Sequence, residues 1–409
     1  DGIRDLVRSR GLGDVYKRRV LLSALALTFG LALTACGNSG SDKAADTGSK
    51  NETAAAKSSG DVFTIGATGP LTGSAASYGN SVKNGATIAI DEINAAGGVK
   101  VGDKTYQLAL NFQDDEAKED KAVNAYNKLM DSKINVYMGA VTSGSSLALT
   151  DLTAKDNILQ ITPSGSAKDI TKNPNAFRLC FTDPLQGKMI ADFVLDQGYE
   201  SVAVLYNNSD EYSTGVYEAF KDELNAKGQS ALIVNEQSFT NDDVDFTTQL
   251  TQIKASGAKL IFVPAYYEAA AHIVQQAKQQ GIDSAFVGSD GWDGIIAQLT
   301  DKSQAEGAVF LSPFLASDPS AAKFTDAYKK AYNATPDQFA ADGYDTVYVI
   351  KADMEKAGSI ESDDLIKAMT EIQVDGITGK VSFNADGEPN KEPKFVTITN
   401  GEYQLFDNN

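Results

Sequence analysis

The sequence predicts an α/β protein with two doubly wound, Rossmann-like lobes. Three observations lead to this prediction. From residue 61 to about residue 314, short β-branched runs alternate with amphipathic segments, which is typical of parallel sheets covered by helices. The alternation forms two series that share their order of elements and carry polar residues at the strand ends. The C-terminal part then changes to alternating strands separated by turn residues.

In the first series, the expected strands are residues 62–69, 106–115, 135–141 and 159–164. Apolar residues at spacings of three and four mark a helix after the first strand: Val82, Ala86, Ala89, Ile90 and Ile93. Gly97 and Gly98 end this helix as a left-handed C-cap would.

In the second series, the expected strands are residues 201–208, 231–239, 259–267, 284–292 and 307–314. Helices separate them, for example Thr214 to Lys227 and Glu268 to Gly281. Two alternating stretches, residues 379–389 and 394–406, are expected as strands at the end of the chain.

The N-terminal segment predicts export. Lys17, Arg18 and Arg19 form a charged region, and the apolar run from Val20 to Leu33 is too short for a comfortable membrane span. A buried core helix fits poorly, because no caps bound the run and a polar stretch follows it. Residues 1–35 are therefore expected to be a signal peptide, whose first part can be over-extended translation, with Val15 as an alternative start.

The stretch from Leu33 to Cys36 reads LTAC and resembles the lipobox of bacterial lipoproteins. That resemblance implies cleavage before Cys36 and a lipid on its sulfur, which would hold the protein on the outer face of the membrane. Residues 37–60 contain no aromatic or branched aliphatic residue, so 36–60 are expected to be a lipidated cysteine and a flexible tether. The long tether favours a one-membrane, Gram-positive-type cell.

Composition excludes several classes of partner and chemistry. Without residues 1–35 the chain has 30 basic and 52 acidic residues, a net charge of −22, so nucleic acid and anionic lipid surfaces are not expected partners. After Cys36 the one remaining cysteine is Cys180, which is expected in the core without a disulfide.

An enzyme is not expected. Nucleophilic triads need a histidine, and the chain has one, His272, on a predicted helix. The shortage of His and Cys also argues against zinc, and the mature chain has no glycine-rich phosphate-binding motif, so no metal or cofactor is expected. The acidic cluster at 114–116 is interpreted as a solvated helix start.

The predicted strand ends carry the most informative residues. In the first series, residues 69–79, 140–146 and 162–167 supply hydroxyls, glycines and helix-start amides, which suit a carboxylate. The second series supplies aromatic residues and an acid at these ends: Tyr212, Tyr266, Tyr267, Asp290 and Trp292. Together they suit a small zwitterion with an apolar side chain, although each loop alone is also typical of ordinary turns and caps.

From about Val62 to the C-terminus the chain resembles the leucine/isoleucine/valine-binding protein family of ABC importers, which has the type I periplasmic binding protein fold. The resemblance is carried by IGATGPLTGSAASYGNSVKNGATIAIDEINAAGGV, ITPSGSA and AFRLCFTDPLQGKMIADF. It implies two lobes joined by three hinge crossings, near Thr182, Pro313 and Gly379, that close on the ligand. The lobes would then comprise residues 61–182 with 313–378, and 183–312 with 379–409.

The resemblance also implies roles for site residues. Ser145 and Ser166 would bind the ligand's carboxylate, while Ser164, Ser166 and Asp290 would bind its ammonium group. The pocket would be bounded by three tyrosines: Tyr78, Tyr212 and Tyr266.

Two positions depart from the family. Many members have a longer acid where Asp290 stands, and Trp292 could either shrink the pocket or stack on an aromatic ligand. The implied protein is a monomeric receptor that delivers an amino acid, most simply leucine, isoleucine or valine, to a permease and its ATPase. A sensory receptor of the same fold for another small amino acid or amide is the alternative.

Overall fold

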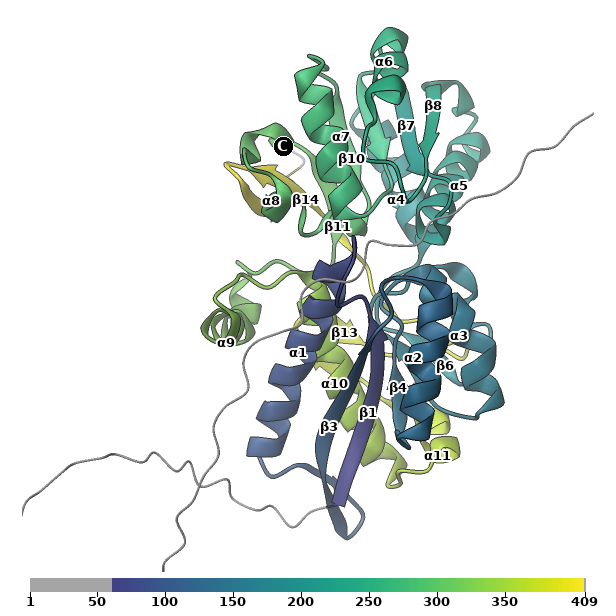
Figure 1. Ribbon diagram of the computed structural model, residues 1–409, viewed down its shortest axis with the longest axis vertical. Coiled ribbons are helices and arrows are strands. Elements are labelled where there is room, and N and C mark those ends of the chain that lie inside the picture. The colour runs from purple at the N-terminus through teal and green to yellow at the C-terminus, as the bar shows by residue number, and fades with distance from the viewer. Residues whose placement is uncertain (1–60, 408–409) are drawn as a thin grey trace, which may run out of the picture. The chain divides into compact units, whose positions relative to one another are not determined.

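The structure, a computed structural model, describes residues 61–407. The predicted signal peptide, Cys36 and the tether lie outside these residues. The described chain builds two lobes, each on its own sheet with helices on both faces (Figure 1). We call the lobe that contains strand β1 the first lobe and the lobe that contains strand β7 the second lobe.

The first lobe has a six-stranded sheet in the order β2-β3-β1-β4-β5-β6. Its strands are β1 (Asp61–Gly69), β2 (Val99–Val101), β3 (Lys104–Asp114), β4 (Val136–Met138), β5 (Gln160–Thr162) and β6 (Ala176–Arg178). All neighbouring pairs are parallel except β2 and β3. The two edge strands, β2 and β6, were not predicted.

Helices cover both faces of this sheet. The helices of this lobe are α1 (Ala76–Ala95), α2 (Glu119–Asp131), α3 (Ser143–Lys155), α9 (Ala322–Tyr332), α10 (Gln338–Ala357) and α11 (Ser362–Ala368). Helix α9 packs on α1, and α11 packs on α10. On β4, Val136 and Met138 join the core under α1 and α10, while Tyr137 packs with α2 and α3 on the opposite face. The predicted end of α1 is confirmed, because Gly97 and Gly98 have positive φ and the Gly98 N–H donates to the Ile93 carbonyl.

The second lobe has a seven-stranded sheet in the order β15-β14-β11-β10-β9-β7-β8. Its strands are β7 (Val202–Asn207), β8 (Ile233–Phe239), β9 (Leu260–Val263), β10 (Ala285–Gly288), β11 (Val309–Ser312), β14 (Lys394–Thr399) and β15 (Glu402–Leu405). The five strands from β11 to β8 in this order are parallel, and β14 and β15 extend the sheet in antiparallel pairs. This arrangement confirms the predicted fold class.

The helices of the second lobe are α4 (Asp183–Asp196), α5 (Glu211–Ala226), α6 (Thr247–Ser256), α7 (Tyr267–Gln279) and α8 (Ile295–Gln298). Alternate residues of β7 join different cores: Val202 and Val204 pack with α4 and α5, and Ala203 and Leu205 pack with α6 and α7. Short 3-10 turns complete both lobes: η1 (Lys168–Thr171), η2 (Ser230–Leu232), η3 (Asp290–Trp292), η4 (Lys302–Ala305), η5 (Pro319–Ala321) and η6 (Met369–Glu371).

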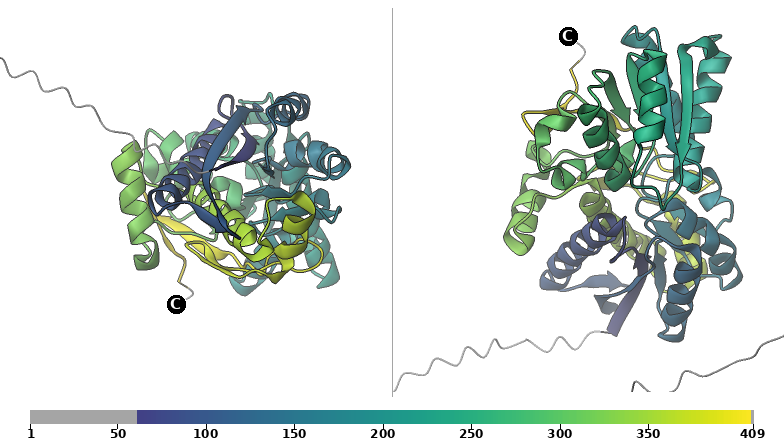
Figure 2. Two further views of the ribbon diagram at one scale, coloured as in Figure 1. Left: turned by 90° about the horizontal axis from the view of Figure 1, so that it is seen from below. Right: turned by 45° about the horizontal axis from the view of Figure 1, so that its top comes forward.

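The chain passes between the lobes three times. The first passage lies between β6 and α4, and the second between β11 and α9. The third is seen as the yellow segment that leads to β14 in Figures 1 and 2.

The third passage lies later than the sequence predicted. Instead of joining the second sheet near Gly379, strand β13 (Gly379–Val381) pairs with β12 (Val374–Gly376) in a separate hairpin. After the hairpin, Phe383 still packs on Phe177 of the first lobe, with ring centroids 5.6 Å apart. The alternation of residues 379–389 therefore predicted a strand correctly, but this strand does not belong to the sheet of the second lobe.

The structure also places the cysteine, the histidine and the acidic cluster that the sequence drew attention to. Cys180 is a buried free thiol, and His272 is half-buried on α7. The solvated helix start predicted at 114–116 is wrong: α2 begins at Glu119, Asp115 is fully buried, and this burial raises the pKa of its carboxyl to about 7. Within residues 61–407, no cluster of three or more His, Cys, Asp or Glu is arranged to hold a metal ion.

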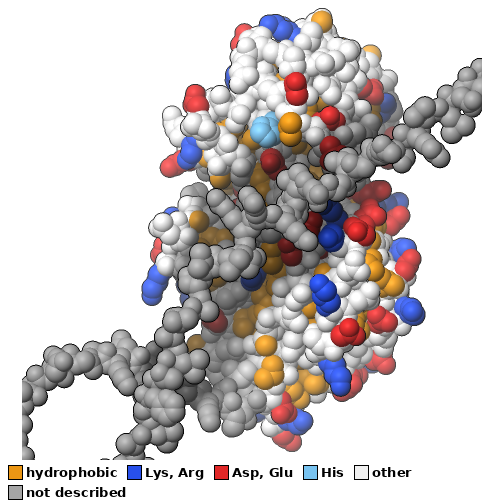
Figure 3. All heavy atoms as spheres, viewed as in Figure 1, with side chains coloured by type: hydrophobic (Ala, Val, Ile, Leu, Met, Phe, Trp, Pro, Cys, Tyr) orange, Lys and Arg blue, Asp and Glu red, His pale blue; other side chains and the backbone are white. Residues whose placement is uncertain are grey.

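Two further features are the distribution of charged side chains on the surface and the polarity of the helices. On the face seen in Figure 3, acidic and basic side chains are interspersed over both lobes. Among residues 61–407, every helix is too short or too polar to cross a membrane.

Candidate functional site

A small cavity lies where the two lobes meet. Its empty volume is about 250 Å³, a figure that includes space open to solvent. The first lobe contributes Tyr78, Val141, Thr142, Ser143, Ser164, Ser166 and Phe339, and the second lobe contributes Tyr212, Tyr266, Asp290 and Gly291. Apart from Phe339, these residues follow the C-terminal ends of parallel strands, the usual ligand-binding edge of doubly wound sheets.

The first-lobe wall is made of hydroxyls and amides. Ser143 begins α3, and its hydroxyl oxygen accepts hydrogen bonds from the Ser166 and Ala167 N–H groups, both at 3.1 Å. The Ser164 hydroxyl donates to the Val141 carbonyl at 2.7 Å. The buried Thr142 hydroxyl has no hydrogen-bond partner within residues 61–407. A helix start with such groups around it favours a negatively charged ligand group.

The second-lobe wall carries a buried acid. The side chain of Asp290 is 5% exposed, and its Oδ1 lies 2.6 Å from the Tyr212 hydroxyl. Burial raises the pKa of the Asp290 carboxyl to about 6, and the hydrogen bonds from Tyr212 and Gln186 act in the opposite direction. At neutral pH this carboxyl is mainly ionised, and it suits a positively charged ligand group.

Aromatic rings form the apolar part of the cavity. Tyr212 and Tyr266 stack with their centroids 5.0 Å apart and their planes inclined by 11°. The ring of Tyr78 meets Tyr266 edge-on at 5.4 Å and packs on Phe339 at 4.0 Å. These rings provide a wall against which an apolar side chain can pack.

The lobes also contact each other directly at the cavity. The Tyr78 hydroxyl donates to the Gly291 carbonyl and accepts a hydrogen bond of 3.0 Å from the Tyr267 N–H. Gln338 Nε2 donates to the Asp290 carbonyl at 2.8 Å, and the Gln338 N–H donates to Asp293 at 2.7 Å. The turn η3 is therefore held from the first lobe by two residues, Tyr78 and Gln338.

The structure brings six of the eight predicted site residues to the cavity: Tyr78, Ser164, Ser166, Tyr212, Tyr266 and Asp290. Ser145 does not line it; it is buried in the first turn of α3, and its hydroxyl has no partner within residues 61–407. Trp292 does not line it either, because its indole N–H donates to the Val263 carbonyl at 2.7 Å and its ring packs below Gly288.

Several lining residues were missed by the sequence analysis. Thr142 and Ser143 lie in the hydroxyl-rich stretch 140–146, which the sequence analysis selected. Within that stretch it predicted Ser145, whereas Ser143 lines the cavity. Phe339 comes from α10, distant in sequence from the other lining residues, and no motif marks it.

Comparison with known proteins identifies the family. The sequence matches the periplasmic binding protein family over residues 62–402. The chain belongs to this family. Among relatives of this periplasmic binding protein is the Leu/Ile/Val-binding protein BraC3 of Rhizobium johnstonii, which is 31% identical over 80% of this chain and 88% of the relative. A leucine-, isoleucine-, valine-, threonine- and alanine-binding protein of Pseudomonas aeruginosa is 27% identical over 80% of this chain and 87% of the relative.

Solved structures agree with this family assignment. The branched-chain amino acid transporter substrate-binding protein LivJ of Streptococcus pneumoniae, in complex with isoleucine, has a TM-score of 0.78 at 30% identity. That comparison covers 84% of this chain and 98% of the LivJ chain. The leucine-binding protein LivK of Thermotoga maritima has a TM-score of 0.77 at 26% identity, covering 85% of this chain and 98% of that one.

Proposed function

We propose that this periplasmic binding protein captures a free amino acid with a branched apolar side chain and delivers it to an ABC importer. One observation carries the proposal: the Asp290 carboxyl and the hydroxyl-and-amide wall around Ser143 come from different lobes and line one cavity. An α-amino acid carries an ammonium group and a carboxylate group on the same carbon atom, which matches one wall that suits a positive group and one that suits a negative group. The branched-chain specificity of the relatives BraC3 and LivJ supports the choice of side chain.

Each wall has a defined role in this proposal. The ligand's carboxylate accepts hydrogen bonds from Ser143, Ser166 and the first amides of α3. Its ammonium group donates to Asp290 and to an oxygen of Ser164. Its side chain packs on Tyr78 and on the other rings, where removal from water supplies affinity.

The ligand screen is the direct test. The fragment that begins at Asp61 is melted with each of the common amino acids at equal concentration. A ligand that binds the folded state alone stabilises it by about 2.7 kcal/mol at one hundred times its dissociation constant. We expect leucine, isoleucine and valine to raise the melting temperature most. If no amino acid raises it, the proposal is wrong.

Closure on the ligand is a part of this proposal. The proposed ligand contacts lie on both lobes, so they can be made together when the lobes approach each other. Small-angle scattering should therefore give a smaller radius of gyration with the best ligand than without it. An unchanged scattering curve at saturation would contradict closure.

We further propose that the protein is a monomer anchored outside the cytoplasmic membrane through lipid on Cys36, in a Gram-positive-type cell, beside its permease and ATPase. The LTAC sequence after a short apolar run supports the anchor. Cys36→Ser should move the full-length protein from the membrane fraction to the soluble fraction. Retention of the variant in membranes after a high-salt wash would contradict lipid anchoring.

A further inference from the structure

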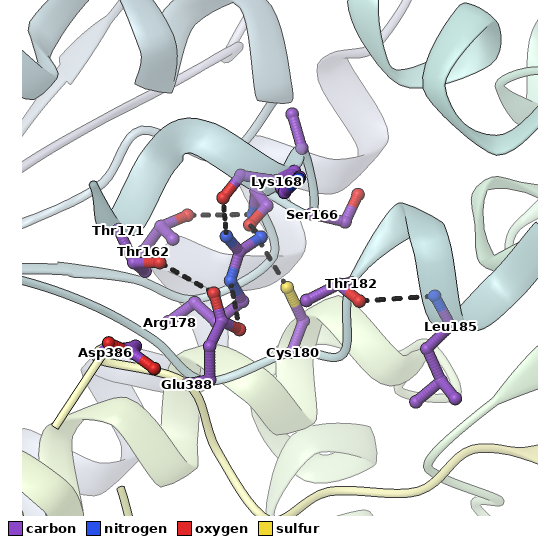
Figure 4. A network of polar contacts seen from close by, with 12 residues as sticks. Thr162, Ser166, Lys168, Thr171, Arg178, Cys180, Thr182, Leu185, Asp386 and Glu388 are labelled. Atoms are coloured by element: carbon purple, nitrogen blue, oxygen red, sulfur yellow. Dashed lines mark hydrogen bonds and ion pairs between the residues drawn. The ribbon is translucent and has the colours of Figure 1, made fainter. Parts of the chain in front are cut away.

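A buried arginine lies directly behind the first-lobe wall of the cavity. Arg178 is the last residue of β6, and its side chain is fully buried. Its guanidinium donates from Nη1 to the Gly165 carbonyl at 3.2 Å and from Nη2 to the Lys168 carbonyl at 3.0 Å (Figure 4). Its Nε lies 2.8 Å from Glu388 Oε2. One planar group thus contacts both the loop after β5 and a residue more than two hundred positions later.

The Gly165 carbonyl belongs to the same peptide unit as the Ser166 N–H. In a planar trans peptide the C=O and N–H bonds point in opposite directions, so a contact that fixes the carbonyl also fixes the N–H. The Gly165 carbonyl lies between Arg178 and the Cys180 thiol, which donates to it at 3.3 Å. On the other side, the Ser166 N–H faces Ser143 at the cavity. Through the Gly165 carbonyl, Arg178 therefore fixes the direction of the Ser166 N–H, although Arg178 itself does not line the cavity.

Glu388 balances the charge of Arg178 and is itself fixed. Its Oε1 accepts a hydrogen bond of 2.6 Å from the Thr171 hydroxyl. The Arg178 N–H donates to the Gly387 carbonyl at 3.1 Å. Gly387 has a φ of +74°, and a Cβ at that position would lie 2.2 Å from the Ala176 carbonyl oxygen, so the backbone of this turn lies against β6. The carboxylate is therefore held beside the guanidinium by side-chain and main-chain contacts.

We propose that Arg178 and Glu388 are positioning residues for ligand binding: their ion pair holds the Gly165–Ser166 peptide, whose N–H donates to the Ser143 hydroxyl oxygen and so keeps the Ser143 O–H directed at the ligand's carboxylate. The inference rests on the proposed function, because it assigns the ion pair a role in the amino-acid site. It also links this site to the third passage between the lobes, since the turn that contains Glu388 leads into β14.

Two variants test the ion pair, and a third is the control. Glu388→Gln keeps the shape of the side chain and removes its charge, while Arg178→Lys keeps the charge and loses the planar fork that reaches two carbonyls and a carboxylate. Asp151→Asn removes a charge from an exposed ion pair with Lys172 on the same lobe. Hydrogen exchange of the Gly165, Ser166 and Ala167 amides is measured without ligand, and amino-acid affinity is measured by calorimetry.

We expect these three amides to exchange at least about tenfold faster in both ion-pair variants, and the affinity to fall about tenfold, as for the loss of a charged hydrogen bond. The control should match the wild type in both measurements. The inference is overturned if Glu388→Gln has amide exchange rates and an amino-acid affinity within twofold of the wild type. This holds even if the variant melts at a lower temperature. If Arg178→Lys does not fold, Glu388→Gln decides alone, because Glu388 is partly exposed.

The two proposals fail in different ways. If the wild type binds no amino acid, the proposed function is wrong, and faster exchange in the variants still supports the positioning of the peptide. If the wild type binds an amino acid and both variants bind it equally well with unchanged exchange, the positioning role is wrong and the proposed function stands.

Discussion

Replacing Asp290 by Asn should weaken amino-acid binding severely without harming the fold. The substitution keeps the shape of the side chain and an acceptor oxygen but removes the charge beside the ligand's ammonium group. A closed cavity leaves that ammonium without water, so the loss of its charged partner costs on the order of 2 to 5 kcal/mol. The affinity should therefore fall roughly thirty-fold to several thousand-fold.

The pH dependence of binding gives a second measure of the same interaction. Burial raises the pKa of the Asp290 carboxyl to about 6 in the ligand-free protein, and the bound ammonium needs the ionised form. The affinity of the wild type should fall about tenfold between pH 7 and pH 5, because about a tenth of the carboxyl is ionised at pH 5. Asp183 and Asp210 also have pKa values raised by burial, so the difference between wild type and Asp290→Asn isolates Asp290.

The stability of the ligand-free protein should change in the opposite direction. Folding raises the pKa of the Asp290 carboxyl from 3.8 to about 6. Above pH 6 the ionised carboxyl therefore lowers the free energy of unfolding, and this penalty disappears as the pH falls below about 4. About two pKa units correspond to about 3 kcal/mol at pH 7. This value is a ceiling for the gain in Asp290→Asn, since the variant also loses the charged contact with Tyr212.

Calorimetry and chemical denaturation measure the three expectations. Asp301→Asn is the control, because it removes one negative charge from an exposed turn of the same lobe and should leave the affinity within about twofold. The reasoning is refuted if Asp290→Asn binds the best amino acid within twofold of the wild type at pH 7. It is also refuted if the loss of affinity comes with a ligand-free protein that unfolds clearly earlier, because Asp290 would then be a structural residue.

Three further predictions concern single sites. Ser143→Ala should weaken binding about tenfold in calorimetry, whereas Ser145→Ala should stay within twofold, and the reverse order would contradict the placement of these serines. Gly85→Ala should lower the free energy of unfolding in urea by about 2 kcal/mol or more, because its Cβ would lie 1.8 Å from a backbone oxygen of α10; Gly144→Ala, with its nearest atom at 3.5 Å, should not. Asp353→Asn should raise the free energy of unfolding more at pH 8 than at pH 5. Burial raises the pKa of the Asp353 carboxyl to about 8, so the cost of its charge in the folded state grows as the pH rises. Equal effects at the two pH values would contradict this.

Much of the site could be predicted because its residues lie at the ends of strands, and strand ends are visible in a sequence. The choice between Ser143 and Ser145 could not be made in this way. Successive helix residues are separated by about 100°, so two residues apart means nearly opposite faces of α3. The sequence shows a hydroxyl-rich helix start, but the rotation of that helix about its axis is fixed by its packing on the sheet.

Two other differences have the same kind of cause. Trp292 follows a strand as a ligand-binding aromatic would, yet the 3-10 turn brings its ring within 2.3 Å of where a Cβ on Gly288 would be, so the glycine makes room for a core residue. Strand β13 has the alternation of a sheet strand, but two N–H groups of the adjoining turn donate to Asp345 on α10, which holds the hairpin on the first lobe. Tertiary contacts decided both cases.

The contacts of turn η3 suggest why ligand binding and lobe closure should depend on each other. Its Asp290 side chain lines the cavity, while its main chain accepts hydrogen bonds from Tyr78 and Gln338 of the first lobe. The same turn is joined to α4 at the first passage, because the Asp290 N–H donates to Gln186 at 3.0 Å. A ligand that fixes the Asp290 carboxylate therefore fixes the groups through which the lobes hold each other. Since a ligand shifts an equilibrium by its differential affinity for the two states, this shared turn favours the closed state in the presence of ligand.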